Sequence, residues 1–218
     1  MKARRVKGLK PSGTLADNLE LIVATRLDEL CSFVPRALDP RRVRELHDMR
    51  IAAKRLRYIL EVGAEPCFGP YAQVAIKRAK ELQDLLGEIH DCDVQLPRVH
   101  AIHDELRAVD AIEARARAGN AGDLDPTLAS GTPHAEAWRG LETLRIYLEA
   151  RRGLLFERFL QMWRDLERDG FRARLQYAVG ERPEPAPEPA PAPPALPSPD
   201  GNVALTSSGV VSSEPDHG

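Results

Sequence analysis

The sequence predicts an all-α protein: a four-helix bundle of long helices, followed by a disordered C-terminal tail rich in Pro, Ala and Glu. Apolar side chains recur every three to four residues over four long stretches, as on one face of an α-helix. Three breaks rich in Pro or Gly separate these stretches. We find no alternating apolar and polar pattern long enough for a strand. Four long amphipathic helices joined by three breaks are typical of a helical bundle.

The first two predicted helices lie on either side of a short connection. Ser12 to Thr14 can cap a helix over about residues 15–34, because small hydroxyl side chains accept hydrogen bonds from the first turn. Pro35 and Pro40 bracket the connection. The second helix is expected over about residues 41–62, and its end is marked by helix-breaking residues: Gly63, Pro66, Gly69 and Pro70.

The third and fourth predicted helices are longer. The third covers about residues 71–96, and Pro97 is expected to end or kink it, with the apolar pattern resuming as far as Ile112. Residues 117–133 contain three Gly and two Pro and are expected to form a mobile loop. The last helix is expected from Ala135 to about Val179.

These patterns divide the chain into three parts: a flexible N-terminus over residues 1–14, a helical domain over 15–179, and a disordered, acidic, Pro-rich tail over 180–218. At the start of the tail, Pro occupies nearly every second position. Proline removes backbone donors and favours extended conformations, so the sequence predicts no packed structure there.

The net charge of −2 conceals an asymmetry. Residues 181–218 hold six acidic side chains and one Arg, which leaves 30 basic and 27 acidic side chains, a net charge of +3, for residues 1–180.

The three cysteines form no CxxC motif and indicate reduced thiols in a cytoplasmic protein. No apolar run approaches the ~18–20 residues that span a bilayer, and no secretory signal is apparent at the N-terminus. We therefore expect no membrane association.

One predicted helix carries an unusual row of cations. Residues 41–57 hold seven Lys or Arg against only Glu45 and Asp48. At about 100° per residue, four basic side chains fall within an arc of roughly 80° beside the apolar face: His47, Arg50, Lys54 and Arg57. Like charges stacked in this way repel one another, and a bound polyanion would relieve the repulsion. The alternative interpretation is a solvated, Arg-rich face.

Two segments together resemble a known family. HDMRIAAKRLRYILE at residues 47–61 and KRAKELQDLLGEIHDCDV at residues 77–94 are similar to the paired motif of the CHAD domain, a helical domain named for its histidines. The resemblance extends over about residues 6–178. It implies non-catalytic binding of inorganic polyphosphate, association with polyphosphate granules, and no cofactor. The residues that it assigns to polyphosphate are His47, Arg50, Lys54, Arg55, Arg57, Lys77, Lys80, His90, Arg151 and Arg152.

The resemblance also implies a partner. The family's full domain consists of two tandem four-helix units, whereas this chain contains one such unit. A lone half of the double bundle would expose an apolar face, so we expect a homodimer with an isologous contact. We also expect His47 to become protonated beside bound phosphates, which would tighten binding at mildly acidic pH.

Other functions remain open from the sequence. The pairs His47-Asp48 and His90-Asp91, followed by Asp93, His100 and His103, allow a metal-dependent phosphohydrolase if they converge on one pocket. Nucleic acid is a competing but less favoured polyanion, because aromatic residues for base stacking are sparse. A granule-coating, phasin-like structural protein is a third alternative. The acidic side chains of the third helix are expected to orient the Arg and Lys opposite them: Asp84, Glu88, Asp91 and Asp93.

Overall fold

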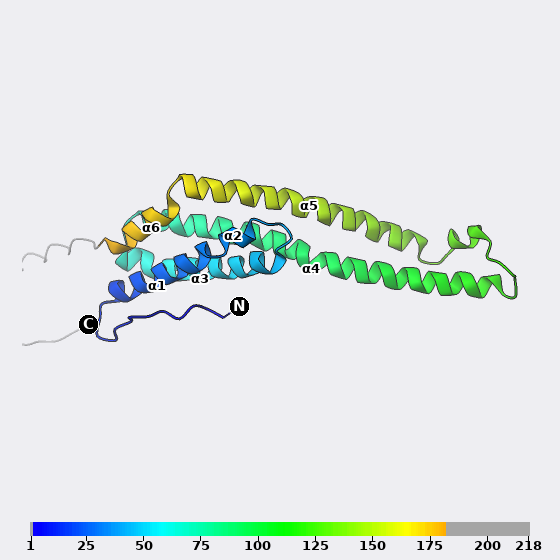
Figure 1. Ribbon diagram of the computed structural model, residues 1–218, viewed down its shortest axis with the longest axis horizontal. Helices are drawn as coiled ribbons and strands as arrows, with labels where there is room; N and C mark the ends of the chain where they lie inside the picture. The colour runs from blue at the N-terminus through cyan, green and yellow to red at the C-terminus, as the bar shows by residue number, and fades with distance from the viewer. Residues whose placement is uncertain (1, 182–218) are drawn as a thin grey trace, which may run out of the picture. The chain divides into compact units, whose positions relative to one another are not determined.

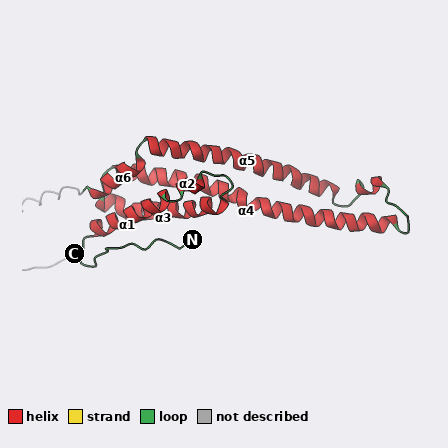
Figure 2. Ribbon diagram, in the orientation of Figure 1, coloured by secondary structure: helices red, strands yellow, loops and turns green. Residues whose placement is uncertain are grey.

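The computed structural model describes residues 2–181, apart from the side chains of residues 64–66 and 129. The elements in chain order are α1 (Leu15–Cys31), α2 (Val34–Ala37), α3 (Val43–Cys67), α4 (Tyr71–Ala118), the 3-10 helix η1 (Pro126–Ala129), α5 (Ala135–Arg168) and α6 (Phe171–Gly180). No strand occurs in this part of the chain, and Figure 2 shows only helices and their connections. The predicted all-α helical bundle is confirmed.

The bundle packs α1, α3, α4, α6 and the C-terminal part of α5 around one apolar core (Figure 1). Thr14 caps α1 as predicted, because its side-chain oxygen accepts a hydrogen bond from the Asp17 backbone nitrogen at 3.1 Å. The apolar stripes of the helices meet in this core, where several large side chains are fully buried: Leu27, Met49, Leu56, Leu82 and Phe159. The α3 face next to this stripe carries the cations, so burial of the core fixes the direction in which they point.

Three helix ends differ from the prediction. α3 continues past Gly63 to Cys67, instead of ending near Val62, because the ring of Phe68 and the side chain of Leu19 pack against Gly63. α4 continues past Pro97 to Ala118, since packing against α5 buries Val99 in the next turn. The predicted last helix is divided at Gly170, whose left-handed φ of 66° ends α5 and starts α6.

The α4–α5 pair extends beyond the ends of α1 and α3 (Figure 1). We call residues 95–150 the arm. At its base, Arg152 binds Asp93 and the backbone oxygen of Pro40. At its tip, the buried Asp110 accepts hydrogen bonds from the backbone and ring nitrogens of His134, which precedes α5. Burial tends to raise the pKa of Asp110, but hydrogen bonds from Thr132 and His134 bring it below its usual range.

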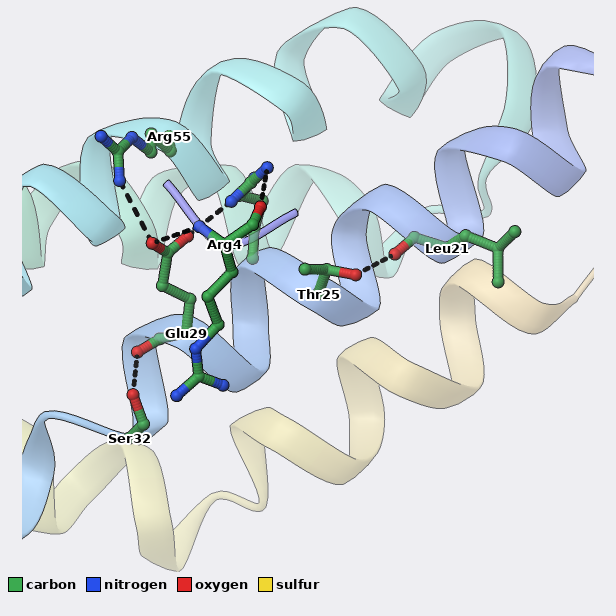
Figure 3. A network of polar contacts seen from close by, with 7 residues as sticks. Arg4, Leu21, Thr25, Glu29, Ser32 and Arg55 are labelled. Carbon is green, nitrogen blue, oxygen red and sulfur yellow. Dashed lines mark hydrogen bonds and ion pairs between the residues drawn. The ribbon is translucent and has the colours of Figure 1, made fainter. Parts of the chain in front are cut away.

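A buried carboxylate connects α1, α3 and the N-terminal segment. Glu29 is only 1% exposed and accepts hydrogen bonds from the Arg4 backbone nitrogen, Arg26 and Arg55. Figure 3 shows the Arg55 guanidinium and the Arg4 nitrogen pointing toward this carboxylate. Residues 2–14 contain no helix, but this contact and the paired hydrogen bonds between Lys10 and Asn18 attach them to α1. The predicted tail lies outside the described residues from residue 182 onward.

Candidate functional site

The predicted cations of α3 face α4 in a regular register. The rings of His47 and His90 lie with their centroids 4.4 Å apart. A side-chain carbon placed on Gly87 would lie 3.7 Å from Arg50 Nε. Three residues forward along α3 thus correspond to three residues back along α4, as antiparallel packing requires. The same register places Lys54 opposite Gln83 and Arg57 opposite Lys80.

We call this surface the cationic strip. It comprises His47, Arg50, Lys54 and Arg57 of α3 together with Lys80, Gln83, Gly87 and His90 of α4. From His47 to Arg57 the strip is about 15 Å long at 1.5 Å per residue. The lack of a side chain on Gly87 leaves room for the Arg50 guanidinium to lie across α4.

Several polar atoms of the strip have no partner. Among the residues whose side chains the structure describes, five buried side-chain N or O atoms lack a hydrogen bond, and four belong to the strip: His47 Nδ1, Arg50 Nε, Arg57 Nε and Gln83 Oε1. A buried polar atom without a partner is unfavourable by about 1–3 kcal/mol. Such atoms commonly mark a place that a ligand or ordered water satisfies. The strip therefore has hydrogen-bonding capacity that the fold itself does not use.

His47 is neutral near physiological pH. Burial lowers the pKa of His47 below its ordinary value, and the neighbouring charges of His90 and Arg50 lower it further, while Asp48 acts in the opposite direction. The protonated ring is therefore unfavourable without an added anion. An anion on the strip would favour the imidazolium, which donates from both ring nitrogens.

An exposed aromatic ring separates two of the cations. The Lys54 ammonium lies 5.5 Å and the Arg57 guanidinium 4.9 Å from the centre of the Tyr58 ring, within the range of cation–π interactions. Glu61 marks the end of the strip, with its oxygen 3.2 Å from Arg57 Nε. This pair is within ion-pair distance but is not aligned as a hydrogen bond, so the Arg57 Nε–H remains unsatisfied.

The structure does not bring every predicted site residue to the strip. Arg55 points to the other side of α3 and binds Glu29 at 3.1 Å. Arg151 binds Glu88 at 2.6 Å and contacts Cys92 Sγ, and Arg152 binds Asp93 at 2.5 Å. These three arginines join helices to one another. Lys77 is exposed one turn from Lys80, at the edge of the strip.

Three residues of this region were not predicted from the sequence: Tyr58, Gln83 and Gly87. The sequence contained a signal for Gln83 and Gly87. The strip residues of α3 are spaced by three, four and three positions, and the same spacing occurs on α4 at Lys80, Gln83, Gly87 and His90. The predicted orienting role of acidic residues on α4 is observed for Glu88 and Asp93, which bind arginines of α5.

Of the histidines considered for a metal site, His47 and His90 are brought together, with ring centroids 4.4 Å apart. His103 pairs with Asp104 at 3.2 Å, and His134 contacts Asp110 at the tip of the arm. Over the side chains that the structure describes, no three His, Cys, Asp or Glu are grouped as metal ligands would be. No helix in this part of the chain is long and apolar enough to span a bilayer.

Comparison with known families agrees with the two motifs on α3 and α4. The model of the CHAD domain matches residues 3–100. Over these residues the chain is similar to the CHAD domain family. The CHAD match contains α1, α2, α3 and the first part of α4, and thus the entire cationic strip. It does not contain α5 or α6. No significant match was found among curated proteins or among solved structures.

Proposed function

We propose that the chain binds inorganic polyphosphate along the cationic strip and does not catalyse a reaction there. The observation that carries this proposal is the row of unpartnered His, Arg and Gln atoms on adjacent faces of α3 and α4. Polyphosphate is a linear anion with only oxygen acceptors, so its receptor needs several fixed donors in line. The similarity of residues 3–100 to the CHAD domain, which is linked to polyphosphate-related proteins, supports the same ligand.

The energetics require the strip to act as a unit. A single exposed ion pair contributes about 0–1 kcal/mol, whereas micromolar affinity requires about 8 kcal/mol. Arg50 and Arg57 are partly buried, so water screens their attraction for phosphate less than at an exposed site. The rigid α3–α4 pair also holds the cations in line before the ligand arrives, which reduces the ordering cost of binding. Association with polyphosphate granules would follow from many such contacts along long chains.

The proposal predicts the effect of charge reversal. Replacing Arg50 and Lys54 with Glu should reduce polyphosphate affinity at least 100-fold. A 100-fold reduction corresponds to a loss of about 3 kcal/mol of binding free energy, and reversing two charges in one line should cost at least that much. The measurement is fluorescence anisotropy with labelled long-chain polyphosphate. The matched control is Arg164→Glu with Arg168→Glu, the same change in net charge on exposed positions of α5, which should retain the affinity.

Three further measurements separate the alternatives. Circular dichroism should show unchanged helicity in the Arg50→Glu, Lys54→Glu variant; loss of helicity would assign these residues to the fold. Polyphosphate should displace DNA from the protein at equal phosphate concentration, and the reverse order of affinity would favour nucleic acid as the ligand. Phosphate release during prolonged incubation with polyphosphate, with or without divalent metal, would contradict a purely binding role.

A further inference from the structure

An exposed stripe on α4 begins one residue before the arm and continues along it beyond the bundle. Seven residues fall within an arc of about 100° at 100° per residue: Val94, Arg98, Ala101, Ile102, Glu105, Val109 and Ile112. All seven are exposed, and the largest apolar ones are Ile102 at 48%, Val109 at 45% and Ile112 at 71%. We call this set the arm stripe. Of the described elements, only α5, η1 and their connections accompany this part of α4 (Figure 1).

The arm stripe is symmetric about its centre. A point between Ala101 and Ile102 has Arg98 and Glu105 at equal distances on its two sides, and Val94 and Val109 at equal distances farther out. Within the described residues, neither Arg98 nor Glu105 takes part in an ion pair or a side-chain hydrogen bond. They are seven residues apart, about 10 Å along the helix, which is too far for them to pair with each other.

We infer that the arm stripe is the contact surface for a second copy of this chain, packed antiparallel across a two-fold axis near Ala101. In this arrangement Arg98 of each copy faces Glu105 of the other, so two ion pairs form at once. Val94 of each copy faces Val109 of the other, and small Ala101 lies near the axis, where it allows close approach. When a second copy is turned antiparallel, its charges are complementary to those of the first. We therefore infer that the partner is the same chain.

The size of the surface suits such a contact. The part of α4 from Val94 to Ala118 is about 37 Å long, and two packed helices are about 20 Å wide. On α5, Leu144 and Tyr147 are also exposed, at 41% and 58%. The face is thus on the order of 700 Å², near the roughly 800 Å² that each partner buries in a standard interface. This inference is independent of the proposed ligand and gives the homodimer expected from the sequence a defined surface.

The test is a charge exchange across the proposed axis. Light scattering at micromolar concentration should give about twice the chain mass of 24.2 kDa for the unaltered protein. Arg98→Glu alone and Glu105→Arg alone each place like charges opposite one another twice, and each should weaken self-association at least tenfold. The double variant, Arg98→Glu with Glu105→Arg, should restore the dimer. Glu157→Arg, an exposed position of α5 outside the stripe, is the control and should remain dimeric.

A second measurement tests the position of the axis. Ala101→Cys should form a disulfide-linked dimer under mild oxidation, because two copies of a residue near a two-fold axis come within disulfide distance. Ala150→Cys, exposed on α5, should not. A monomeric unaltered protein, a double variant that stays monomeric, or equal cross-linking of both cysteine variants would each overturn the inference.

Discussion

At the scale of single residues, a carboxylate from another helix distinguishes the structural arginines from Arg50 of the strip. Arg55 faces the buried Glu29, and Arg152 faces Asp93, which is 7% exposed. Arg50 instead faces Gly87 and has an unsatisfied Nε. A partly buried cation without a counter-ion is unfavourable in the free protein. If the strip binds an anion as proposed, it does so at the cost of local stability, whereas the paired arginines contribute to the fold.

His47 gives a prediction about pH. Burial, His90 and Arg50 lower the pKa of His47 in the folded state, so the unfolded chain binds more protons than the folded one below about pH 6.5. The stabilising contribution is complete above that pH and is lost as the pH falls through the lowered pKa. We therefore expect His47→Gln to show a smaller fall in melting temperature between pH 7.5 and pH 5 than the unaltered protein.

The control for this prediction is His100→Gln, at an exposed position on the arm, which should keep the original pH dependence. Bound phosphate should instead favour the protonated ring of His47. Polyphosphate affinity should therefore increase more toward pH 5.5 in the unaltered protein and in His100→Gln than in His47→Gln. Suppose that His47→Gln and the unaltered protein have the same pH dependence of melting temperature and of polyphosphate affinity. His47 would then contribute neither to the pH dependence of stability nor to that of binding.

At the scale of elements, replacing each of two helical glycines with alanine should change the stability of the protein in opposite directions. A Cβ on Gly63 would lie 2.7 Å from the Phe68 ring and 2.9 Å from Leu19 Cδ1, whereas a Cβ on Gly153 would meet nothing within 4 Å. Alanine favours helix over glycine by about 1 kcal/mol. We expect Gly153→Ala to stabilise by about 0.5–1 kcal/mol, and Gly63→Ala to destabilise by about 1–3 kcal/mol because of overpacking.

Urea unfolding monitored by circular dichroism measures both effects. The opposite signs provide an internal control, because helix propensity alone would make both alanine variants more stable. A gain of stability for Gly63→Ala would mean that Phe68 and Leu19 move without cost, and that the end of α3 is not fixed by their packing.

Helix positions could be predicted from the sequence, but several helix ends could not. Apolar periodicity located the cores of α1, α3, α4 and α5, since burial of one face is a local pattern. Pro97 did not end α4, because contacts with α5 outweigh the lost backbone hydrogen bond, and that partner is distant in sequence. Gly170 was not recognised as a break, because the surrounding apolar pattern continues through it.

The same limit applies to the candidate site. The arc of His47, Arg50, Lys54 and Arg57 follows from helix geometry alone and could be read from the sequence. The separation of Arg55, Arg151 and Arg152 from that arc could not, because their carboxylate partners lie 26, 63 and 59 residues away. Only the packing of α1, α4 and α5 reveals which cations are already neutralised.

At the scale of the whole molecule, the strip is a local concentration of positive charge on a chain of net charge −2. If about four phosphates are neutralised, the logarithm of polyphosphate affinity should fall with the logarithm of salt concentration with a slope of about −3, as for single-stranded nucleic acids. Affinities measured between 50 and 500 mM NaCl should thus differ by about 1,000-fold. Lys54→Gln should reduce the slope by about 0.7, and a slope near zero would contradict electrostatic binding.

The antiparallel register of α3 and α4 also determines where the chain tolerates changes in length. Adding or deleting one residue between Lys54 and Gln83 within either helix would rotate the following side chains by about 100° and separate the two halves of the strip. The connection between Ala118 and Ala135, at the far end of the arm, has no such constraint. Insertions there should leave the strip intact, so related chains can differ in the length of this hairpin while keeping the same spacing from His47 to His90.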